Sequence, residues 1–185
     1  MVSTAVYESP VPLTSRAMSQ VVYTDGACRG NPGPGGWAWA LDEEQYASGF
    51  DPATTNQRME ILAAFQAVRS LPGDLEVRSD STYVVNCFVK HWYKGWHAKG
   101  WRNSQRQPVA NRDLWEPFID LVLERGDVRF TWVKGHGTDP MNQLVDGLAV
   151  EAALTGDGRR RGDFEFPDAP GKRPEPPAPV QDQLF

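Results

Sequence analysis

The sequence has little that would indicate a secreted or membrane protein. Its 185 residues include only two cysteines, Cys28 and Cys87, whose spacing matches neither a disulfide framework nor a metal-binding motif, which favours a reducing compartment. No apolar run approaches the ~20 residues of a membrane span. The N-terminus through Met18 lacks both the positive start and the apolar core of a signal peptide. We therefore expect a cytoplasmic protein with a short polar arm, and Met18 is an alternative first residue because it directly precedes the first predicted strand.

Positive charge is also scarce overall but concentrated in one stretch. The formal net charge is −5, which argues against a protein that coats nucleic acid by charge alone. Between residues 90 and 115, however, only Asp113 is acidic, whereas six residues are cationic: Lys90, Lys94, Lys99, Arg102, Arg106 and Arg112. Large aromatics are interleaved with these cations: Trp92, Tyr93, Trp96, Trp101 and Trp115. They could pack in a core, but the alternation favours a surface that binds phosphates and lies against sugars or bases, with some tryptophans doing both.

The apolar periodicity predicts a single α/β domain. Short β-rich segments at residues 21–24, 37–41 and 46–50 predict an antiparallel meander, and two further strands are expected at residues 75–78 and 128–133. Amphipathic patterns predict helices at residues 57–71, 83–89, 112–124 and 139–154. The alternation of strands and helices after the meander indicates a mixed sheet with helices packed against it.

Acidic side chains recur where these elements begin or end. Asp25 follows the first strand and precedes a run holding five glycines and two prolines, which we expect to continue neither a strand nor a helix. Asp80 follows the fourth strand, and Glu60 lies in the first turns of a helix. Taken singly, these residues fit a turn residue, an N-cap and a solvated acid favoured by the helix dipole. Taken together, they suggest one site.

Two further residues fit a catalytic site with these acids. Asp146 lies near the start of the last predicted helix, beside an apolar stretch. His136 lies between Gly135 and Gly137, where a packed core histidine is rare, so it is either exposed to solvent or a general acid–base group.

In this order the motifs resemble ribonuclease H of the bacterial type-one class, over about residues 21–153. The resemblance is carried by Thr24-Asp25-Gly26 with Asn31-Pro32-Gly33-Pro34-Gly35-Gly36, Arg58-Met59-Glu60, Ser79-Asp80-Ser81, Trp132-Val133-Lys134-Gly135-His136, and Asn142 with Asp146. It implies an α/β, ribonuclease H-like fold: a five-stranded mixed sheet, with the three antiparallel strands first, flanked by helices. It also implies a sequence-independent endonuclease that hydrolyses the RNA strand of RNA–DNA hybrids, leaves 5′-phosphomonoesters and acts in primer and R-loop removal during replication and repair.

The resemblance further implies two-metal catalysis. The metal-binding carboxylates would be Asp25, Glu60, Asp80 and Asp146, and the loop histidine would be His136. Two Mg²⁺ ions about 4 Å apart, for which Mn²⁺ can substitute, would activate a water and stabilise the departing 3′ oxygen. We expect Asp25 and Asp80 to be the central ligands, Glu60 to hold the second ion and contact a ribose 2′-OH, Asp146 to complete the site, and His136 to move protons or help the product leave. Mutual repulsion predicts raised carboxylate pKa values in the metal-free protein.

The same resemblance assigns residues to the substrate. Asn31, Asn56 and Gln57 would contact the minor groove and sugars of the hybrid, and Thr55, Trp92 and Trp115 would hold its DNA strand. Lys94, Trp96, Lys99 and Trp101 complete the expected nucleic-acid-binding set. The sequence departs from the family at Gln57 and Gln143, where asparagine and an acid are common, and at residues 96–101, where cations are usually denser. We therefore expect weaker and more salt-sensitive hybrid binding than in relatives with a denser cluster.

Four segments are expected along the chain: a flexible arm at residues 1–19, the catalytic domain at 20–155, a disordered linker rich in proline and arginine at 156–180, and a peptide at 181–185. In that peptide Gln181, Leu184 and Phe185 resemble the motif by which bacterial replication and repair enzymes bind the DNA polymerase sliding clamp. A chance match, or docking onto the protein's own body, is the alternative. For the whole chain the alternatives are a non-catalytic hybrid-binding adaptor and a different nuclease on this fold, such as a transposase or resolvase. The complete acid set favours the enzyme, and a monomer is the simplest expectation.

Overall fold

The computed structural model describes residues 19–135 and 137–164; the predicted N-terminal arm, except Ser19, and the predicted C-terminal peptide lie outside these residues. At its centre is a six-stranded sheet in the order β5-β4-β1-β2-β3-β6. The strands are β1 (Gln20–Cys28), β2 (Gly33–Ala40), β3 (Tyr46–Thr54), β4 (Leu75–Ser79), β5 (Val128–Trp132) and β6 (Arg160–Arg161). Strands β1, β4 and β5 are parallel, whereas β2, β3 and β6 pair antiparallel on the other side of β1. The predicted mixed α/β sheet is confirmed, with one short strand more than the five expected.

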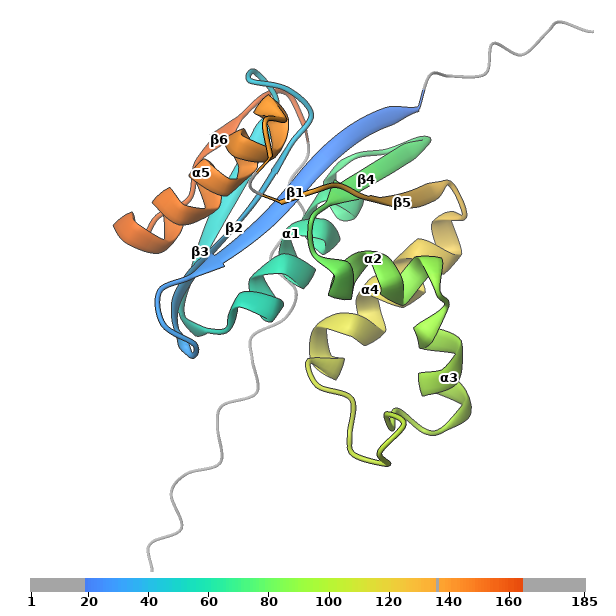
Figure 1. Ribbon diagram of the computed structural model, residues 1–185. Helices are drawn as coiled ribbons and strands as arrows, with labels where there is room; N and C mark the ends of the chain where they lie inside the picture. The colour runs from blue at the N-terminus through green and yellow to red at the C-terminus, as the bar shows by residue number, and fades with distance from the viewer. Residues whose placement is uncertain (1–18, 136, 165–185) are drawn as a thin grey trace, which may run out of the picture.

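Helices cover both faces of this sheet (Figure 1). The helices are α1 (Asn56–Ser70), α2 (Thr82–Val89), α3 (Trp92–Ala98), α4 (Arg112–Arg125) and α5 (Pro140–Thr155). Helix α5 lies on one face, and α1 lies on the other with α2 and α4 beside it. Side-chain alternation divides the core accordingly: Tyr23 and Ala38 pack in the α5 cluster, and Val22 and Trp37 pack in the α1 cluster. Within the described residues, no helix has the length and apolarity needed to span a membrane.

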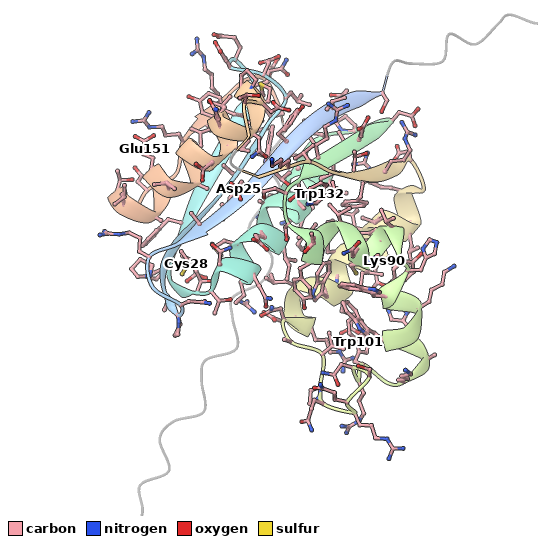
Figure 2. All side chains as sticks on the ribbon, viewed as in Figure 1. Asp25, Cys28, Lys90, Trp101, Trp132 and Glu151 are labelled. Atoms are coloured by element: carbon pink, nitrogen blue, oxygen red, sulfur yellow. The ribbon has the colours of Figure 1, made fainter. Side chains whose placement is uncertain are left out.

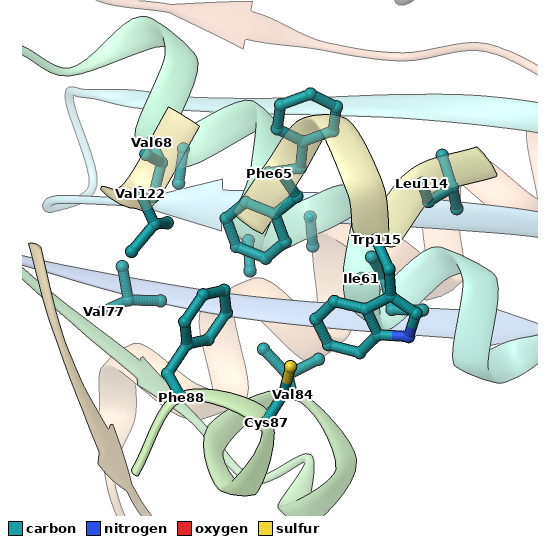
Figure 3. Close-up of a cluster of buried hydrophobic side chains, with 14 of the residues drawn as sticks. Ile61, Phe65, Val68, Val77, Val84, Cys87, Phe88, Leu114, Trp115 and Val122 are labelled. Carbon is teal, nitrogen blue, oxygen red and sulfur yellow. The ribbon is translucent and has the colours of Figure 1, made fainter. Parts of the chain in front are cut away.

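The larger core lies between α1, α2 and α4 (Figure 3). Trp115 and Phe118 of α4 are fully buried and stack with ring centroids 6.0 Å apart, and Phe88 of α2 packs against both. Phe118 also stacks on Phe65 of α1 at 5.3 Å. The Trp115 indole N–H donates to the Tyr83 hydroxyl at 3.0 Å. This aromatic cluster fixes α4 against α1 and α2.

Most of the glycine-rich run is strand, and only residues 29–32 form a turn. Strand β1 continues past Asp25 to Cys28, and β2 begins inside the run at Gly33. The prediction that the glycines end the strand is therefore wrong. The reason is close packing: a Cβ at Gly36 would lie 2.2 Å from the carbonyl oxygen of Ala149, so only glycine lets α5 lie directly on β2.

Residues 156–164, which we call the C-terminal strap, extend the fold past the predicted domain end at residue 155. The Ser48 amide donates to the Arg159 carbonyl oxygen, and β6 pairs with β3. Arg159 also forms an ion pair with Glu151 of α5 at 2.6 Å, and Phe164 packs edge-on against Trp39 at 4.7 Å. The expectation of a disordered linker is wrong for these residues. Pairing at a strand edge uses backbone groups, which the composition of a segment does not reveal.

Candidate active site

Asp25 and Asp80 follow the last register pair of two parallel strands. Thr24 of β1 pairs with Ser79 of β4, and each acid is the next residue along the chain. Residue alternation puts the Asp25 side chain on the sheet face covered by α5, the same face as its β2 partner Ala38. Strands β4 and β2 lie on opposite sides of β1, and open α/β sheets bind ligands beyond the carboxyl ends of parallel strands at such a point. Asp25 therefore lies just beyond the last parallel pair but still within β1. Figure 2 labels its position.

Glu60 comes from the opposite face, and its approach depends on a glycine. A Cβ at Gly26 would lie 2.3 Å from the Glu60 backbone nitrogen and 2.4 Å from the Met59 carbonyl carbon, so the first turns of α1 lie directly on β1. Both carboxylate oxygens of Glu60 accept hydrogen bonds, one from the Ser81 hydroxyl at 2.6 Å and one from the Asn56 side-chain amide at 2.9 Å. Ser81 is also the N-cap of α2. Glu60 is thus fixed relative to both helices.

The fourth acid comes from α5. Asp146 lines a depression of about 270 Å³ together with Asp25, Asp80, Gly137, Asn142 and Gln143. Asn142 is buried, and its Oδ1 has no hydrogen-bond partner within residues 19–135 and 137–164. The structure therefore brings three of the predicted carboxylates to one depression. Glu60 is near enough to act electrostatically on Asp25.

The loop after β5 lies against Asp80. Trp132 donates its indole N–H to the Asp80 carbonyl oxygen at 3.1 Å, and a Cβ at Gly135 would lie 2.5 Å from Asp80 Oδ2. Glycine at residue 135 therefore allows the loop to approach the carboxylate. The predicted acid–base residue, His136, lies outside the described residues, and its role stays a prediction. Gly137, on its other side, lines the depression.

Burial and repulsion between neighbouring acids raise the pKa values of Asp25 and Glu60. The pKa of Asp25 is raised from 3.8 to about 7, first because the carboxyl group is buried and next because Asp80 repels its charge. A hydrogen bond from the Gly26 amide to Asp25 Oδ1, at 2.7 Å, partly offsets this, and Asp146 and Glu60 add weaker repulsion. The pKa of Glu60 is also raised, chiefly by burial. The predicted rise in carboxylate pKa is confirmed for Asp25 and Glu60.

The donor set fits a divalent cation of the Mg²⁺ type. Carboxylate and amide oxygens are the ligands that hard cations take. A cation would relieve the repulsion on Asp25 and give Asn142 Oδ1 a partner. Within the described part of the chain, no group of three or more His, Cys, Asp or Glu side chains is arranged to hold a metal ion as it stands. Binding would therefore have to draw the carboxylates inward against their repulsion.

Of the residues predicted to contact the hybrid, Thr55, Asn56 and Gln57 lie close to Glu60 along the chain. Thr55 is the N-cap of α1, accepting from the Arg58 amide, while Asn56 binds Glu60. Gln57 is exposed on the first turn of α1, and Asn31 is exposed in the turn between β1 and β2. These positions are open to a nucleic acid, and the contacts themselves stay predictions.

The basic stretch forms a second surface on the side of α2 and α3, where Figure 2 labels Lys90 and Trp101. A hollow of about 530 Å³ is lined by Lys90, His91, Trp92, Gly95, Trp96, Lys99, Arg102, Asn103 and Ser104. Trp92 and Trp96 are half-buried, with ring centroids 6.5 Å apart, and Lys94 and Lys99 are exposed. Partly exposed aromatics among cations suit the predicted contact with a nucleic-acid backbone.

Two tryptophans of this stretch belong to the core instead. Trp115 has 0% of its surface exposed, so the prediction that it contacts the DNA strand directly is wrong. Trp101 is 8% exposed, with the Arg112 guanidinium 5.0 Å from its ring centroid, and offers at most an edge. Trp115 is buried because α4 packs onto α1 and α2, whereas Trp101 packs against Trp96 and His97 after α3. The local sequence shows neither contact.

Several residues that orient the acids, or let neighbouring elements approach them, are not predicted to do so from the sequence. Ser81 and Asn56 hold the two oxygens of Glu60, and Gly26 and Gly135 let α1 and the β5 loop approach. Two signals were available in the sequence. Asn56 and Glu60 have the i, i+4 spacing of helical neighbours, and Ser81 is a strong N-cap residue before an apolar helix.

Comparisons with known proteins agree with this geometry. The family model described as RNase H matches residues 17–154. A protein of Caulobacter vibrioides named ribonuclease HI is 46% identical over 135 residues, covering 70% of this chain and 89% of that protein. A protein of Moorella thermoacetica named ribonuclease H is 47% identical over 136 residues, covering 71% and 89%. Among solved structures, LC9-RNase H1, a type 1 RNase H with the type 2 active-site motif, superposes with a TM-score of 0.62 at 25% identity, covering 96% of this chain and 99% of that one.

Proposed function

Because this chain belongs to the RNase H family, and is a ribonuclease H, we propose that it cleaves the RNA strand of RNA–DNA hybrids internally, using Mg²⁺ and without sequence preference. One observation supports this most: the register of β1 and β4 puts Asp25 and Asp80 at the end of the parallel strands, with Asp146 at the same depression. A cluster of buried and half-buried acids is costly to fold, so it calls for a function that needs it.

We assign a role to each acid from its surroundings. Asp25, Asp80 and Asp146 line the depression and would hold the ions, with Asn142 Oδ1 as a further oxygen ligand or an orienting group. When bound, two Mg²⁺ ions supply an activated water and stabilise the departing 3′ oxygen. Glu60, whose oxygens are oriented by Ser81 and Asn56, would join the second ion and accept a hydrogen bond from a ribose 2′-OH. The loop residue His136 would move a proton or assist product release.

Discrimination between the strands rests on two surfaces. The start of α1, with Asn56 and Gln57, and the β1–β2 turn, with Asn31, would contact sugars and the minor groove of the hybrid. The DNA strand would be held through its backbone by Thr55, Trp92, Lys94, Trp96 and Lys99. Such contacts depend on backbone shape and charge, so cleavage would be independent of base sequence.

We place this activity in primer and R-loop removal in the cytoplasm, by a monomer. Gln181, Leu184 and Phe185 would dock the enzyme on the DNA polymerase sliding clamp, because two large apolar residues after a polar, proline-rich segment suit an anchor in a partner's pocket. Pull-down of the clamp should fail with a Leu184→Ala, Phe185→Ala double variant. Equal recovery with the intact protein and the double variant would remove this part of the proposal.

The decisive experiment is cleavage of a labelled RNA–DNA hybrid with Mg²⁺ by the wild type, Asp80→Asn and the matched control Asp120→Asn, whose acid is exposed on α4. Asp80→Asn should cut more than ~100-fold more slowly, the upper loss for a residue that only supports a metal ligand. It should still bind hybrid in fluorescence anisotropy, and Asp120→Asn should cut like the wild type. A wild type that binds hybrid without cutting it would point to the adaptor. Equal cutting by Asp80→Asn would refute the mechanism.

A further inference from the structure

A second pair of side chains on β1 and β4 lies two residues before the acid pair, Asp25 and Asp80. In the parallel register of β1 and β4, Tyr23 pairs with Arg78, and each lies two residues before an acid, Asp25 or Asp80. Two residues along a strand return to the same face at a spacing of ~6.5 Å. The Tyr23 ring accordingly packs in the α5 cluster and is 7% exposed. This second pair therefore lies behind the acids, under α5, without lining the depression.

Hydrogen bonds tie this second pair to the start of α5. The Tyr23 hydroxyl donates to Asp139 Oδ2 at 2.9 Å and accepts from Arg78 Nη1 at 3.0 Å. Arg78 Nε in turn donates to Glu76 Oε1 at 2.9 Å, and the guanidinium lies 5.6 Å from the Tyr23 ring centroid. Each group in this series of hydrogen bonds thus has a hydrogen-bond partner. Arg78, which donates to the Tyr23 hydroxyl, fixes the direction in which that hydroxyl donates.

Asp139 uses its other oxygen to cap α5. Its Oδ1 accepts from the amides of Met141 and Asn142 at 2.9 and 3.4 Å. One carboxylate therefore fixes the helix start to the sheet. That helix start carries Asn142 into the depression, and Asp146 follows about one turn further along α5.

We propose that Tyr23, Arg78 and Asp139 are positioning residues that hold the start of α5 in place over the acid pair, so that turnover depends on them. None of the three lines the acid depression. This inference deepens the proposed function and rests on it for its kinetic part. Its structural part, the anchoring of α5 through Tyr23, is separate.

The first test compares Tyr23→Phe with the matched control Tyr46→Phe. Tyr46 lies on β3 and packs against the same core cluster, and it does not line the depression. Tyr23→Phe removes only the hydroxyl and should lower kcat about fivefold to tenfold, with KM for the hybrid changed less than about twofold. Tyr46→Phe should keep wild-type kcat. Equal kcat in both variants would overturn the proposal, as would a loss confined to KM.

A second readout needs no catalysis. In metal-free protein, hydrogen exchange at the Met141 and Asn142 amides should speed up about fivefold to tenfold in Tyr23→Phe and stay unchanged in Tyr46→Phe. Exchange in the last turns of α5 should be unchanged in both. Unchanged exchange at the two capped amides would overturn the anchoring. If the wild type proves unable to cleave hybrid, the proposed function fails, whereas faster exchange would still establish the anchor.

Asp139→Ser separates the cap from the anchor. Serine is a good N-cap but is too short to also reach the Tyr23 hydroxyl, so α5 keeps its cap and loses its tie to the sheet. We expect the kcat of Asp139→Ser to match that of Tyr23→Phe, and the double variant to be no worse than either single one. A wild-type kcat in Asp139→Ser, or additive losses in the double variant, would show that the network does not position the site.

Discussion

In the absence of metal, Asp25→Asn should make the protein more stable at neutral and alkaline pH while abolishing catalysis. Asp25 is buried beside Asp80 in the acid cluster, and its pKa is raised to about 7. Asparagine keeps the size of the side chain and the oxygen that accepts from the Gly26 amide at 2.7 Å. The substitution removes the negative charge and replaces the other carboxylate oxygen with an amide NH2 group. Stability and activity should therefore move in opposite directions.

The magnitude follows from the pKa shift. The rise from 3.8 to about 7 corresponds to about 4 kcal/mol at 1.36 kcal/mol per pKa unit. Between these two pH values the folded protein keeps a proton on Asp25 that the unfolded chain has released. The free energy of unfolding of the wild type therefore falls as pH rises through this window. Asp25→Asn lacks this loss, so its advantage should be near zero at about pH 4 and approach ~4 kcal/mol at about pH 8.

Urea denaturation in the presence of EDTA, followed by tryptophan fluorescence across this pH range, measures the effect. Asp120→Asn, at an exposed position on α4, is the matched control and should show no such growth with pH. Saturating Mg²⁺ should then stabilise the wild type and leave Asp25→Asn unchanged. The difference in free energy of unfolding between the two proteins should therefore become smaller. A difference between wild type and Asp25→Asn that does not grow with pH would refute the reasoning, and so would a destabilised variant at alkaline pH.

Four further substitutions test how the site and its surroundings are built. Gly26→Ala should lower the free energy of unfolding by about 1–3 kcal/mol and slow hybrid cleavage, because the new Cβ pushes the start of α1 off β1. Urea denaturation measures the first effect and a cleavage assay the second. A variant with wild-type stability and cleavage would show that the close approach of α1 to β1 is dispensable. Trp115→Ala should lose about 3–5 kcal/mol of stability because the side chain is fully buried. Trp96→Ala should instead weaken hybrid binding, measured by anisotropy, more than it lowers stability. A larger stability loss in Trp96→Ala than in Trp115→Ala would contradict the assignment of Trp115 to the core and Trp96 to the binding surface. Phe164→Ala should lose about 1–2 kcal/mol of stability with its contact to Trp39 while kcat stays unchanged, so a lower kcat would contradict a purely structural strap.

The positions of the clustered acids could be predicted from sequence because they are set by local structure. Asp80 follows a strand, and Asp25 follows the last residue of the parallel pairing, so each is identified by the element before it. Glu60 lies on the first turns of a helix that begins at a recognisable cap, Thr55. The sheet order then brings these short-range features together, and the family's motifs provide that order in advance.

What could not be predicted depends on contacts between distant segments. Gly36 looks like a loop residue until Ala149 of α5 is seen to occupy the space of its missing side chain. Trp115 among cations looks like a surface residue until Tyr83, 32 residues earlier, is found to accept its indole N–H. The strap has the same origin, because the Arg159 carbonyl pairs with a strand 111 residues earlier, at Ser48. None of these partners can be read from the surrounding sequence.

The strap also determines where an attachment to this protein would begin. Phe164, the last described residue, lines a cavity of about 1040 Å³ together with Ser70 and Leu71 at the end of α1, whereas Glu60 lies near the start of that helix. The helix between Glu60 and Ser70 is about 15 Å long at ~1.5 Å per residue. A fluorophore, a surface tether or a fused domain joined after Phe164 therefore starts well away from the acid depression. Immobilising the enzyme from that side leaves the catalytic face free to meet a nucleic acid supplied in solution.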